Sequence, residues 1–454
     1  MTPLWTSSEI ALSTQGRASD HFDVSGVAFD SREVGPGDLF VALQGETTDG
    51  HHFVDQAFAQ GAAGVLVSRP VAGPHILVGN TTNALDALGI ASRQRMRGTI
   101  VGVTGSVGKT SVKEALYAAF DRAAPGRAHR SLKSYNNHVG VPLSLARMPR
   151  ETRFGVFEMG MNHAGELSAL TRLVRPHVAL VTTVALAHGA FFADEGAIAD
   201  AKGEIFRGLE PGGTAIIPFD SPHRDRLTAA AMAYAGEIVT FGRNPRADIY
   251  AREGLAGPRG TFVQARLRTA EMSFTVGPPG EHWVTNALAV LAAVEAAGGD
   301  LAAAGLALAD LAGLPGRGRR ITIRLADGDA LLIDEAYNAN PASMRATLAM
   351  LGQEKGRKVA ILGSMRELGP EEGQHHAALA EPIAAAGVDL ALLVGTEMKP
   401  LAEALEGRIK FVHVPDAATA AAQAARLIAP GDAVLVKGSN SVGLAGVVDA
   451  LAGG

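Results

Sequence analysis

The stretch IVGVTGSVGKTS, residues 100–111, sets the architecture of this chain. A strand pattern over Thr99–Val103 is followed at once by a glycine-rich turn and by a helical stretch from Thr110. Lys109 therefore opens a helix directly after a strand. This is the context of a phosphate-binding loop, in which backbone N–H groups and the helix N-terminus hold phosphate oxygens. Val103 stands where the standard spacing has glycine, so a plain strand–helix turn with a solvated lysine is the alternative.

Each residue type in this loop has a chemical use. Lys109 would reach the terminal phosphates of a nucleotide, and the hydroxyl of Thr110 would bind Mg²⁺. Gly105, Ser106 and Gly108 form the turn that brings backbone N–H groups to the phosphates. The loop thus predicts a nucleotide site with a magnesium ion.

Outward from the loop, strand patterns alternate with helical ones. Strands are predicted at Phe154–Glu158, Val178–Val184 and Thr214–Ile217. Such alternation is typical of a parallel sheet covered by helices on both faces. Residues 237–276 are expected to form a more irregular β-rich insert, with helices following at about 283–297 and 301–312.

A glycine- and proline-rich segment, LAGLPGRGRR (311–320), precedes a second alternating pattern. Two strands flank ADGD as in a hairpin, and Asn340–Pro341 supplies an N-cap residue and a proline for the first helical position. Further strands are predicted at Val359–Leu362, Leu390–Val394, Phe411–Val414 and Ala433–Val436. We therefore expect an α/β chain of three domains. These are a small domain of short strands over residues 1–97, a central parallel-sheet domain over 98–314 and a smaller Rossmann-like domain over 315–454.

The composition excludes several classes of protein. The 454 residues suffice for about three domains of ~150 residues, and 47% hydrophobic against 19% charged residues allow large cores. A net charge of −5 gives no basic footprint for nucleic acid, and the absence of cysteine excludes disulfides and thiolate metal sites. No signal peptide and no membrane span are predicted. We expect a cytoplasmic protein that works as a monomer.

Six further motifs follow one another along the chain. They are KSYNNHVGVPLSL (133–145), EMGMNHAGEL (158–167), AHGAFF…AKGEIF (187–206), DEAYNANPASM (334–344), LGSMRELG (362–369) and KGSNS (437–441). Together with TGSVGKT they resemble the Mur ligase family, from about residue 25 to the C-terminus. The resemblance implies an enzyme that uses ATP and Mg²⁺ to activate a carboxylate as an acyl phosphate and joins it to an amine. Among family members it is similar to those that add D-alanyl-D-alanine to UDP-N-acetylmuramoyl-tripeptide, a peptidoglycan precursor, which makes both substrates small molecules.

The resemblance implies a metal site beside the phosphate loop. Glu158 at a strand end and His188 on a loop match the family's Mg²⁺ ligands, which act with Thr110. Lys202, on a helix expected from Glu195, would lie near them, where an ammonium and a metal cation would repel each other. The family likeness implies that this lysine reacts with CO₂ and binds Mg²⁺ as a carbamate. Lys109, Glu158, His188 and Lys202 are thus the predicted catalytic residues; without the resemblance, the last three would be taken as solvated side chains.

Further residues are assigned to ligands by the same resemblance. Asn286 would face the adenine of ATP, and Arg317 would reach its phosphates. Those expected near the ribose, in the DEAYNANP motif, are Asp334, Glu335 and Asn338. Those expected to contact the UDP group are Ser31, Arg32, Asp49 and His51, although Asp49 also lies in a routine turn sequence. Those expected at the sugar or peptide are Asn136, Asn137 and Asn162, and those expected at the dipeptide or phosphate are Lys437 and Ser439.

Two other functions stay open. A related ligase that adds the third amino acid to UDP-N-acetylmuramoyl-dipeptide shares the N-terminal pattern, but the chain has no DNPR-like signature of that enzyme. An inactive homologue that serves as a scaffold is disfavoured by the intact Lys109, Glu158, His188 and Lys202. The third residue of the tripeptide, diaminopimelate or lysine, does not follow from the sequence.

Overall fold

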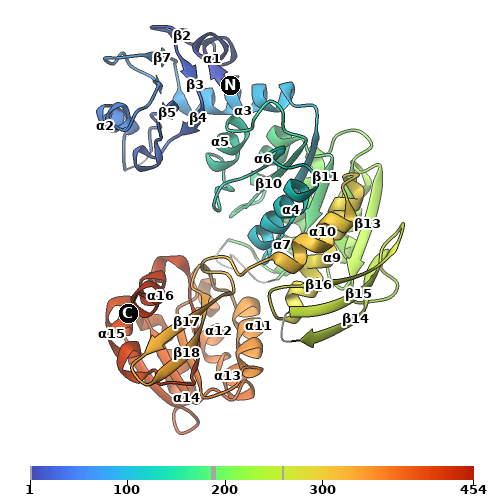
Figure 1. Ribbon diagram of the computed structural model, residues 1–454, viewed down its shortest axis with the longest axis vertical. Coiled ribbons are helices and arrows are strands. Elements are labelled where there is room, and N and C mark those ends of the chain that lie inside the picture. The colour runs from blue at the N-terminus through green and yellow to red at the C-terminus, as the bar shows by residue number, and fades with distance from the viewer. Residues whose placement is uncertain (1–2, 46, 186–190, 258–259, 454) are drawn as a thin grey trace.

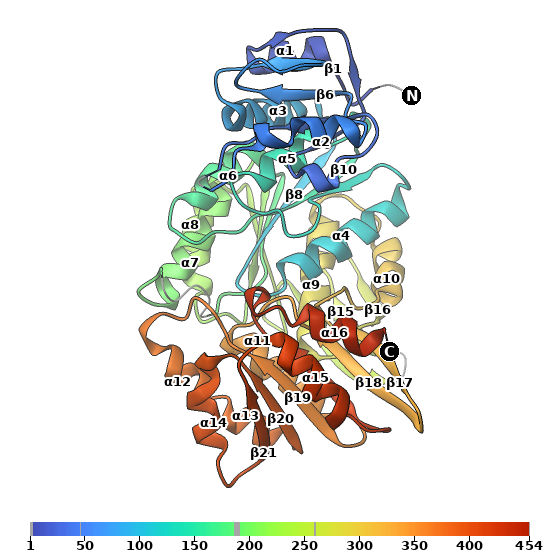
Figure 2. The same cartoon turned by 90° about the vertical axis from the view of Figure 1, so that its left-hand side faces the viewer.

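The computed structural model describes residues 3–45, 47–185, 191–257 and 260–453. Within these ranges the strands form sheets of five, nine and six strands and one two-stranded ribbon. Each large sheet belongs to one of three domains that follow one another along the long axis of the molecule, from the blue N-terminal end to the red C-terminal end (Figures 1 and 2). The α/β fold of three domains, with a mostly parallel central sheet, is as predicted; the boundaries at residues 97 and 314 stay a prediction.

The N-terminal domain holds the five-stranded sheet. Its strand order is β2 (Arg17–Ala18), β7 (His75–Leu77), β6 (Gly64–Val67), β5 (Asp38–Val41) and β4 (Gly26–Ala28), with only β2 antiparallel. The ribbon joins β1 (Trp5–Thr6) to β3 (Asp23–Val24), and the helices are α1 (Ser7–Thr14), α2 (Val54–Ala59) and α3 (Thr81–Arg95). Thr6 and Glu9 form a capping box that starts α1, because each side chain satisfies a backbone N–H of the first turn.

The central domain is built on the nine-stranded sheet. Its order is β16 (Glu271–Val276), β15 (Gly260–Arg266), β14 (Ile249–Gly257), β13 (Glu237–Gly242), β12 (Thr214–Pro218), β11 (Val178–Val181), β8 (Thr99–Thr104), β10 (Phe154–Glu158) and β9 (Ala128–Arg130). The strands from β14 to β9 are parallel, and β15 and β16 are antiparallel. The segment expected as a more irregular β-rich insert extends the main sheet, since β13 pairs directly with β12.

Helices cover both faces of this sheet. One face packs against α4 (Lys109–Ala123), α9 (Glu281–Ala296) and α10 (Leu301–Asp310). The other packs against α5 (Gly140–Ala146), α6 (Glu166–Val174), α7 (Glu195–Gly203) and α8 (Arg224–Met232). Successive strand residues point to opposite faces, so Val101 and Val103 enter the first core while Ile100 enters the second. This two-sided burial is why the strand reads as a continuous apolar run.

The C-terminal domain carries the six-stranded sheet. Its order is β17 (Arg319–Leu325), β18 (Gly328–Glu335), β22 (Ala433–Lys437), β19 (Lys358–Gly363), β20 (Leu390–Val394) and β21 (Lys410–Val414). Only the predicted β17–β18 hairpin is antiparallel. The helices are α11 (Pro341–Gly352), α12 (Glu372–Ala377), α13 (Ala380–Ala385), α14 (Lys399–Leu405), α15 (Ala417–Leu427) and α16 (Ala445–Ala452). Asn340 caps α11 and Pro341 occupies its first turn, as predicted.

A helix that crosses a membrane must be both long and apolar, so the length and hydropathy of the helices bear on this point. Across the part of the chain that the structure describes, none is both long enough and apolar enough to cross a bilayer.

Candidate active site

A cavity of about 500 Å³ lies between the central and C-terminal domains. The carboxyl ends of β8, β10, β18 and β22 all open into it, as expected for ligand sites of parallel sheets. The predicted residues that line it are Ser106, Gly108, Lys109, Thr110, Asn136, Glu158, Asn162, Lys202, Asn286, Arg317, Glu335, Asn338 and Lys437. The fold thus gathers residues that are up to about three hundred positions apart in the sequence.

The glycine-rich turn between β8 and α4 is shaped by close packing. Gly108 precedes α4 with a φ of 87°, and a Cβ added there would lie 2.8 Å from Oδ1 of Asn286. A Cβ on Gly105 would lie 1.9 Å from Oγ1 of Thr182. Only glycine fits at both positions. The segment that follows β11 also holds the turn, since the Ser106 hydroxyl donates to the carbonyl of Ala185 at 2.8 Å.

Lys109 lies within this turn rather than on the outer surface. Its Nζ donates to the carbonyl of Gly105 at 2.7 Å, so the side chain folds over the loop. Burial lowers the pKa of Lys109, nearby Glu158 raises it, and Arg317 lowers it further. A cation at the N-terminus of a helix can bind phosphate oxygens together with the free backbone N–H groups of the first turn.

Glu158 is the most constrained acid of the cavity. It ends β10 and is 1% exposed. Its Oε2 accepts from the Thr110 hydroxyl and its Oε1 accepts from Nδ2 of Asn136, each at 2.8 Å. A hydroxyl and a carboxylate side by side are hard oxygen donors of the kind that Mg²⁺ prefers, so the donor set fits the predicted metal. Its proposed partner His188 lies outside the described residues.

The described part of the chain contains no larger cluster of metal-binding side chains. Groups of three or more histidine, aspartate and glutamate side chains that could hold a metal ion are absent among the described residues. The Thr110–Glu158 pair, a hydroxyl with one carboxylate, is too small to be such a group.

Lys202 lies on α7 and is 2% exposed. No carboxylate of the described ranges lies within ion-pair distance of its Nζ. Burial lowers the pKa of Lys202 well below its ordinary value, and the nearby positive charge of Lys109 lowers it further. Because only the neutral amine of a lysine is nucleophilic, a lowered pKa favours reaction of this side chain as a nucleophile.

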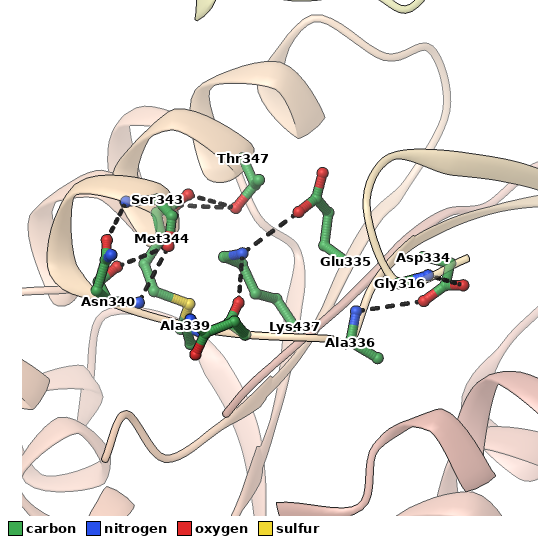
Figure 3. A network of polar contacts seen from close by, with 11 residues as sticks. Gly316, Asp334, Glu335, Ala336, Ala339, Asn340, Ser343, Met344, Thr347 and Lys437 are labelled. Atoms are coloured by element: carbon green, nitrogen blue, oxygen red, sulfur yellow. Dashed lines mark hydrogen bonds and ion pairs between the residues drawn. The ribbon is translucent and has the colours of Figure 1, made fainter. Parts of the chain in front are cut away.

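The C-terminal domain contributes one wall of the cavity, and a network of polar contacts lies in this part of the domain (Figure 3). Lys437 ends β22 beside Glu335, which ends β18, and the Lys437 ammonium is 3.3 Å from Oε2 of Glu335. It also donates to the carbonyl of Asn338 at 2.9 Å. Burial lowers the pKa of Lys437, while Glu335 opposes that shift. The α11 residues Ser343 and Thr347 line the same wall.

Asp334 and Glu335, both candidates for the ribose contact, differ in placement. The carboxylate of Asp334 accepts from the backbone N–H of Gly316 at 2.7 Å and of Ala336 at 3.2 Å (Figure 3). Asp334 does not itself line the cavity. Glu335 lines the cavity. Of these two acids, Glu335 is therefore the better candidate for the ribose contact.

Arg317 spans the two domains. Its guanidinium lies 4.2 Å above the ring of Tyr337, and its Nη2 is 3.5 Å from the Ser134 hydroxyl of the central domain. Stacking on the ring fixes the plane of the guanidinium and leaves its N–H groups directed at the cavity.

Several predicted residues do not reach this cavity. The Oδ1 of Asn137 accepts from the backbone N–H of Gly140, the first residue of α5, at 2.9 Å. The Ser439 hydroxyl accepts from the backbone N–H of Arg366 at 2.9 Å. Gly105 shapes the phosphate loop from behind.

The four candidates for the UDP group lie in the N-terminal domain. The Ser31 hydroxyl donates to Oε1 of Gln56 at 3.1 Å, and the exposed Arg32 pairs with Asp30. His51 is buried; its Nε2 accepts from the backbone N–H of Ser68 at 2.9 Å, so Nδ1 carries the proton that it donates to Asp49 at 2.6 Å. Asp49 and His51 thus brace a local turn, and a UDP contact stays a prediction for all four.

The structure also places residues in the site that the sequence did not single out. Lys113 is fully buried, and its Nζ lies 3.0 Å from Oε1 of Glu114, 2.5 Å from the carbonyl of Lys133 and 3.9 Å from Oε2 of Glu158. Its spacing of four from Lys109, on one helix face, is the signal that could have found it. His282, one helical turn before Asn286, also lines the cavity, and burial lowers its pKa.

Family comparisons agree with this architecture. Three family models match in chain order: the Mur ligase family catalytic domain at residues 23–102, the Mur ligase middle domain at 103–294 and the Mur ligase glutamate ligase domain at 319–440. The chain belongs to the Mur ligase family.

Individual relatives narrow the comparison. The UDP-N-acetylmuramoyl-tripeptide–D-alanyl-D-alanine ligase of Escherichia coli K12 is 36% identical over 94% of this chain and 93% of its own length. The protein of that name from Bacillus subtilis is 35% identical over 78% of this chain and 76% of its own. MurF of Acinetobacter baumannii superposes with a TM-score of 0.85 at 32% identity and 99% coverage of both chains. MurF ligase of Thermotoga maritima in complex with ADP gives 0.77 at 26% identity, with 94% and 97% coverage.

Proposed function

We propose that this chain uses ATP to join D-alanyl-D-alanine to the terminal carboxylate of UDP-N-acetylmuramoyl-tripeptide. One observation carries the proposal: the phosphate loop with its Thr110–Glu158 pair faces Arg317 and Lys437 of another domain across a single cavity. The names of the full-length relatives support the choice of substrates. The third residue of the tripeptide, diaminopimelate or lysine, is left to experiment.

ATP binding rests on charge and hydrogen bonding from both walls. Lys109 and Arg317 would neutralise phosphate oxygens, and the N–H groups that open α4 would hold them. Asn286, which is 8% exposed beside Gly108, would face the adenine, and Glu335 and Asn338 would face the ribose. Phosphoryl transfer requires mainly such positioning and electrostatics from a protein.

A magnesium ion would be held by Thr110 and Glu158, with His188 and the carbamate of Lys202 as further proposed ligands. When bound, it would neutralise charge on the phosphate oxygens. The Nζ of Lys113 lies 3.9 Å from Oε2 of Glu158, so a positively charged side chain lies beside this carboxylate.

The reaction needs two steps in one closed space. An oxygen of the tripeptide carboxylate attacks the γ-phosphorus, ADP leaves, and an acyl phosphate forms. The free amine of D-alanyl-D-alanine then attacks the acyl carbon, the amide bond forms, and inorganic phosphate leaves. Asn136 and Asn162 would orient the tripeptide end, and Lys437 would lie near the leaving phosphate or the dipeptide carboxylate. The cavity walls would keep water from the acyl phosphate.

The proposal is tested by a product assay. The chain is incubated with ATP, Mg²⁺, D-alanyl-D-alanine and either the diaminopimelate or the lysine form of UDP-tripeptide, and phosphate and product mass are measured. Phosphate release that depends on all substrates, with a mass gain of one dipeptide, is expected. Turnover of UDP-dipeptide with a free amino acid instead would identify the third-residue ligase, and no turnover of any set would favour a scaffold. We further propose a cytoplasmic monomer, which light scattering of the purified chain and fractionation of cells would check.

A further inference from the structure

Residues 131–137, which we call the junction loop, contact all three domains. The loop follows β9 and precedes α5. On its outer side the Tyr135 hydroxyl donates to Oε1 of Glu33 at 2.8 Å, and the Lys133 ammonium pairs with the same oxygen. The Tyr135 ring also lies 5.4 Å from the ring of Phe29. Glu33 directly follows Ser31 and Arg32, so the loop is fastened to the turn that carries two predicted UDP contacts.

On its inner side the same loop reaches the phosphate site. Asn136, the next residue after Tyr135, donates to Oε1 of Glu158 at 2.8 Å, and its carbonyl accepts from the backbone N–H of Gly160 at 2.8 Å. The Ser134 hydroxyl lies 3.5 Å from Thr110 Oγ1 and 3.5 Å from Nη2 of Arg317. Neighbouring residues of one short loop therefore contact the N-terminal domain and the acid of the metal site.

The backbone of the loop is held in an unfavourable conformation. Lys133 has a φ of 48°, a left-handed region that side chains other than glycine rarely adopt. Its carbonyl accepts from the fully buried Lys113 at 2.5 Å, while its own ammonium pairs with Glu33. Such a conformation persists only where surrounding contacts fix it. Here contacts from two domains fix it from opposite sides.

We propose that Tyr135 is a positioning residue that couples the 30–33 turn of the N-terminal domain to the nucleotide site. Its hydroxyl holds the loop at Glu33, and the loop in turn sets where Asn136 meets Glu158. A ligand that orders the 30–33 turn therefore favours the arrangement that binds the nucleotide, and by thermodynamic necessity the nucleotide favours the ligand equally. This inference rests on the proposed function, which supplies the UDP-linked ligand at that turn.

The experiment measures this coupling directly. The dissociation constant of a non-hydrolysable ATP analogue with Mg²⁺ is determined by calorimetry with and without saturating UDP-N-acetylmuramoyl-tripeptide. For the wild-type chain we expect the ratio of the two constants to be about fivefold or more. In Tyr135→Phe, which removes only the hydroxyl, the ratio should fall at least threefold toward one. Each ligand measured alone should bind within about twofold of wild type.

Two further variants separate coupling from general damage. Glu33→Ala removes the carboxylate that accepts from the Tyr135 hydroxyl, so it should lower the ratio as Tyr135→Phe does. The double variant should lose no more than the larger single effect, because the contact that Tyr135→Phe removes is already absent in Glu33→Ala. Asp310→Ala is the matched control, since it breaks an exposed ion pair with Arg122 on α4 that lies outside the loop, and it should leave the ratio unchanged.

Other outcomes overturn the inference. A ratio of one in the wild-type chain, an unchanged ratio in Tyr135→Phe, additive effects in the double variant or equal losses in both single-ligand affinities would each do so. Failure of the wild-type chain to bind the UDP-tripeptide at all would instead remove the proposed function, and the inference with it. The wild-type arm therefore tells the two failures apart.

Discussion

Lys109 and Lys202 line the same cavity, but their surroundings give them different chemistry. Lys109 donates to a backbone carbonyl of the phosphate loop, whereas Lys202 has no carboxylate partner within the described ranges and is almost fully buried. A buried ammonium without a partner is costly, so the lysine is driven toward its neutral amine. The first side chain is suited to neutralise phosphate, and the second to react as a nucleophile.

Lys109→Ala tests the phosphate role. We expect phosphate release to fall by on the order of 10²–10³ or more, because a positioned charge is lost from the site of phosphoryl transfer. Binding of UDP-tripeptide should persist, since the predicted contacts to the UDP group lie in the N-terminal domain and Lys109 lies in the central domain. Turnover comes from a phosphate assay and binding from calorimetry. Normal turnover in this variant would remove the phosphate loop from the mechanism, and a loss of thermal stability alone would indicate a structural lysine.

Lys202→Ala tests the carbamate. We expect most ligation activity to be lost and partly restored by formate or acetate, because a small carboxylate can take the place of the carbamate oxygens. Lys202→Arg should stay inactive, since a guanidinium remains a cation beside the metal. Phosphate release is measured with and without each added salt, with sodium chloride as the ionic-strength control. Full activity of Lys202→Ala without added carboxylate would contradict the carbamate.

Two adjacent acids show why the roles of single residues cannot always be predicted from the sequence. Asp334 and Glu335 are neighbours on β18, and successive strand residues point to opposite sides, so at most one can face the cavity. Which one does so depends on the loop at Gly316, whose N–H binds Asp334. Lys113 was not predicted for a similar reason. Its burial depends on the contact between α4 and the junction loop, and no local sequence pattern predicts that contact.

Elements were predicted best where the hydrophobic period is strong. The strands of the nine-stranded and six-stranded sheets alternate with helices as expected, because both faces of the parallel strands are buried. The segment 237–276 was harder, since β14, β15 and β16 form an antiparallel extension in which only one face is well buried. The pairing of β13 with β12, which joins this extension to the main sheet, is a long-range contact and left no local signal.

His376 on α12 links a helix to a loop and predicts a pH effect. Its Nε2 accepts from the backbone N–H of Met365 at 2.9 Å, and the side chain is fully buried. Burial lowers the pKa of His376 to about 4. Below an unfolded pKa of about 6.5 the unfolded chain takes up a proton that the folded chain does not. Stability should therefore fall by about 1.4 kcal/mol per pH unit, reach a loss of about 3 kcal/mol and level off below about pH 4.

His376→Gln isolates this contribution. The amide oxygen can still accept from Met365 but does not titrate. Between pH 6.5 and pH 4 the slope of the unfolding free energy against pH should therefore correspond to about one proton fewer than in the wild-type chain. Urea unfolding followed by circular dichroism at pH 7, 6 and 5 measures the slope. His52→Gln, at an exposed histidine of the 3-10 helix Gly50–Phe53, is the matched control. Equal slopes in wild type and His376→Gln would show that the acid sensitivity arises elsewhere.

Across the molecule, the domains differ in how self-contained their cores are. Among the described residues, both cores of the C-terminal domain draw on residues between Ile321 and Leu451 alone. The main core of the N-terminal domain includes Leu143 and Ala146 from α5 of the central domain. Trp5 also donates from Nε1 to the carbonyl of Ala146 at 2.8 Å. Residues on both sides of residue 97 therefore share one core, whereas the two C-terminal cores contain residues from Ile321 onward.

This difference predicts how isolated fragments behave. The fragment 315–454 should unfold cooperatively in urea, because about 140 residues with two complete cores bury enough apolar surface. The fragment 1–97 should not, because it loses Leu143 and the hydrogen bond of Trp5; burial of one leucine alone is worth about 2–3 kcal/mol, a large share of the stability of so small a domain. Circular dichroism and the dispersion of amide proton signals distinguish the two. Cooperative unfolding of 1–97 would mean that α5 merely rests on the N-terminal domain, and the junction loop beside it would then be held from the central side alone.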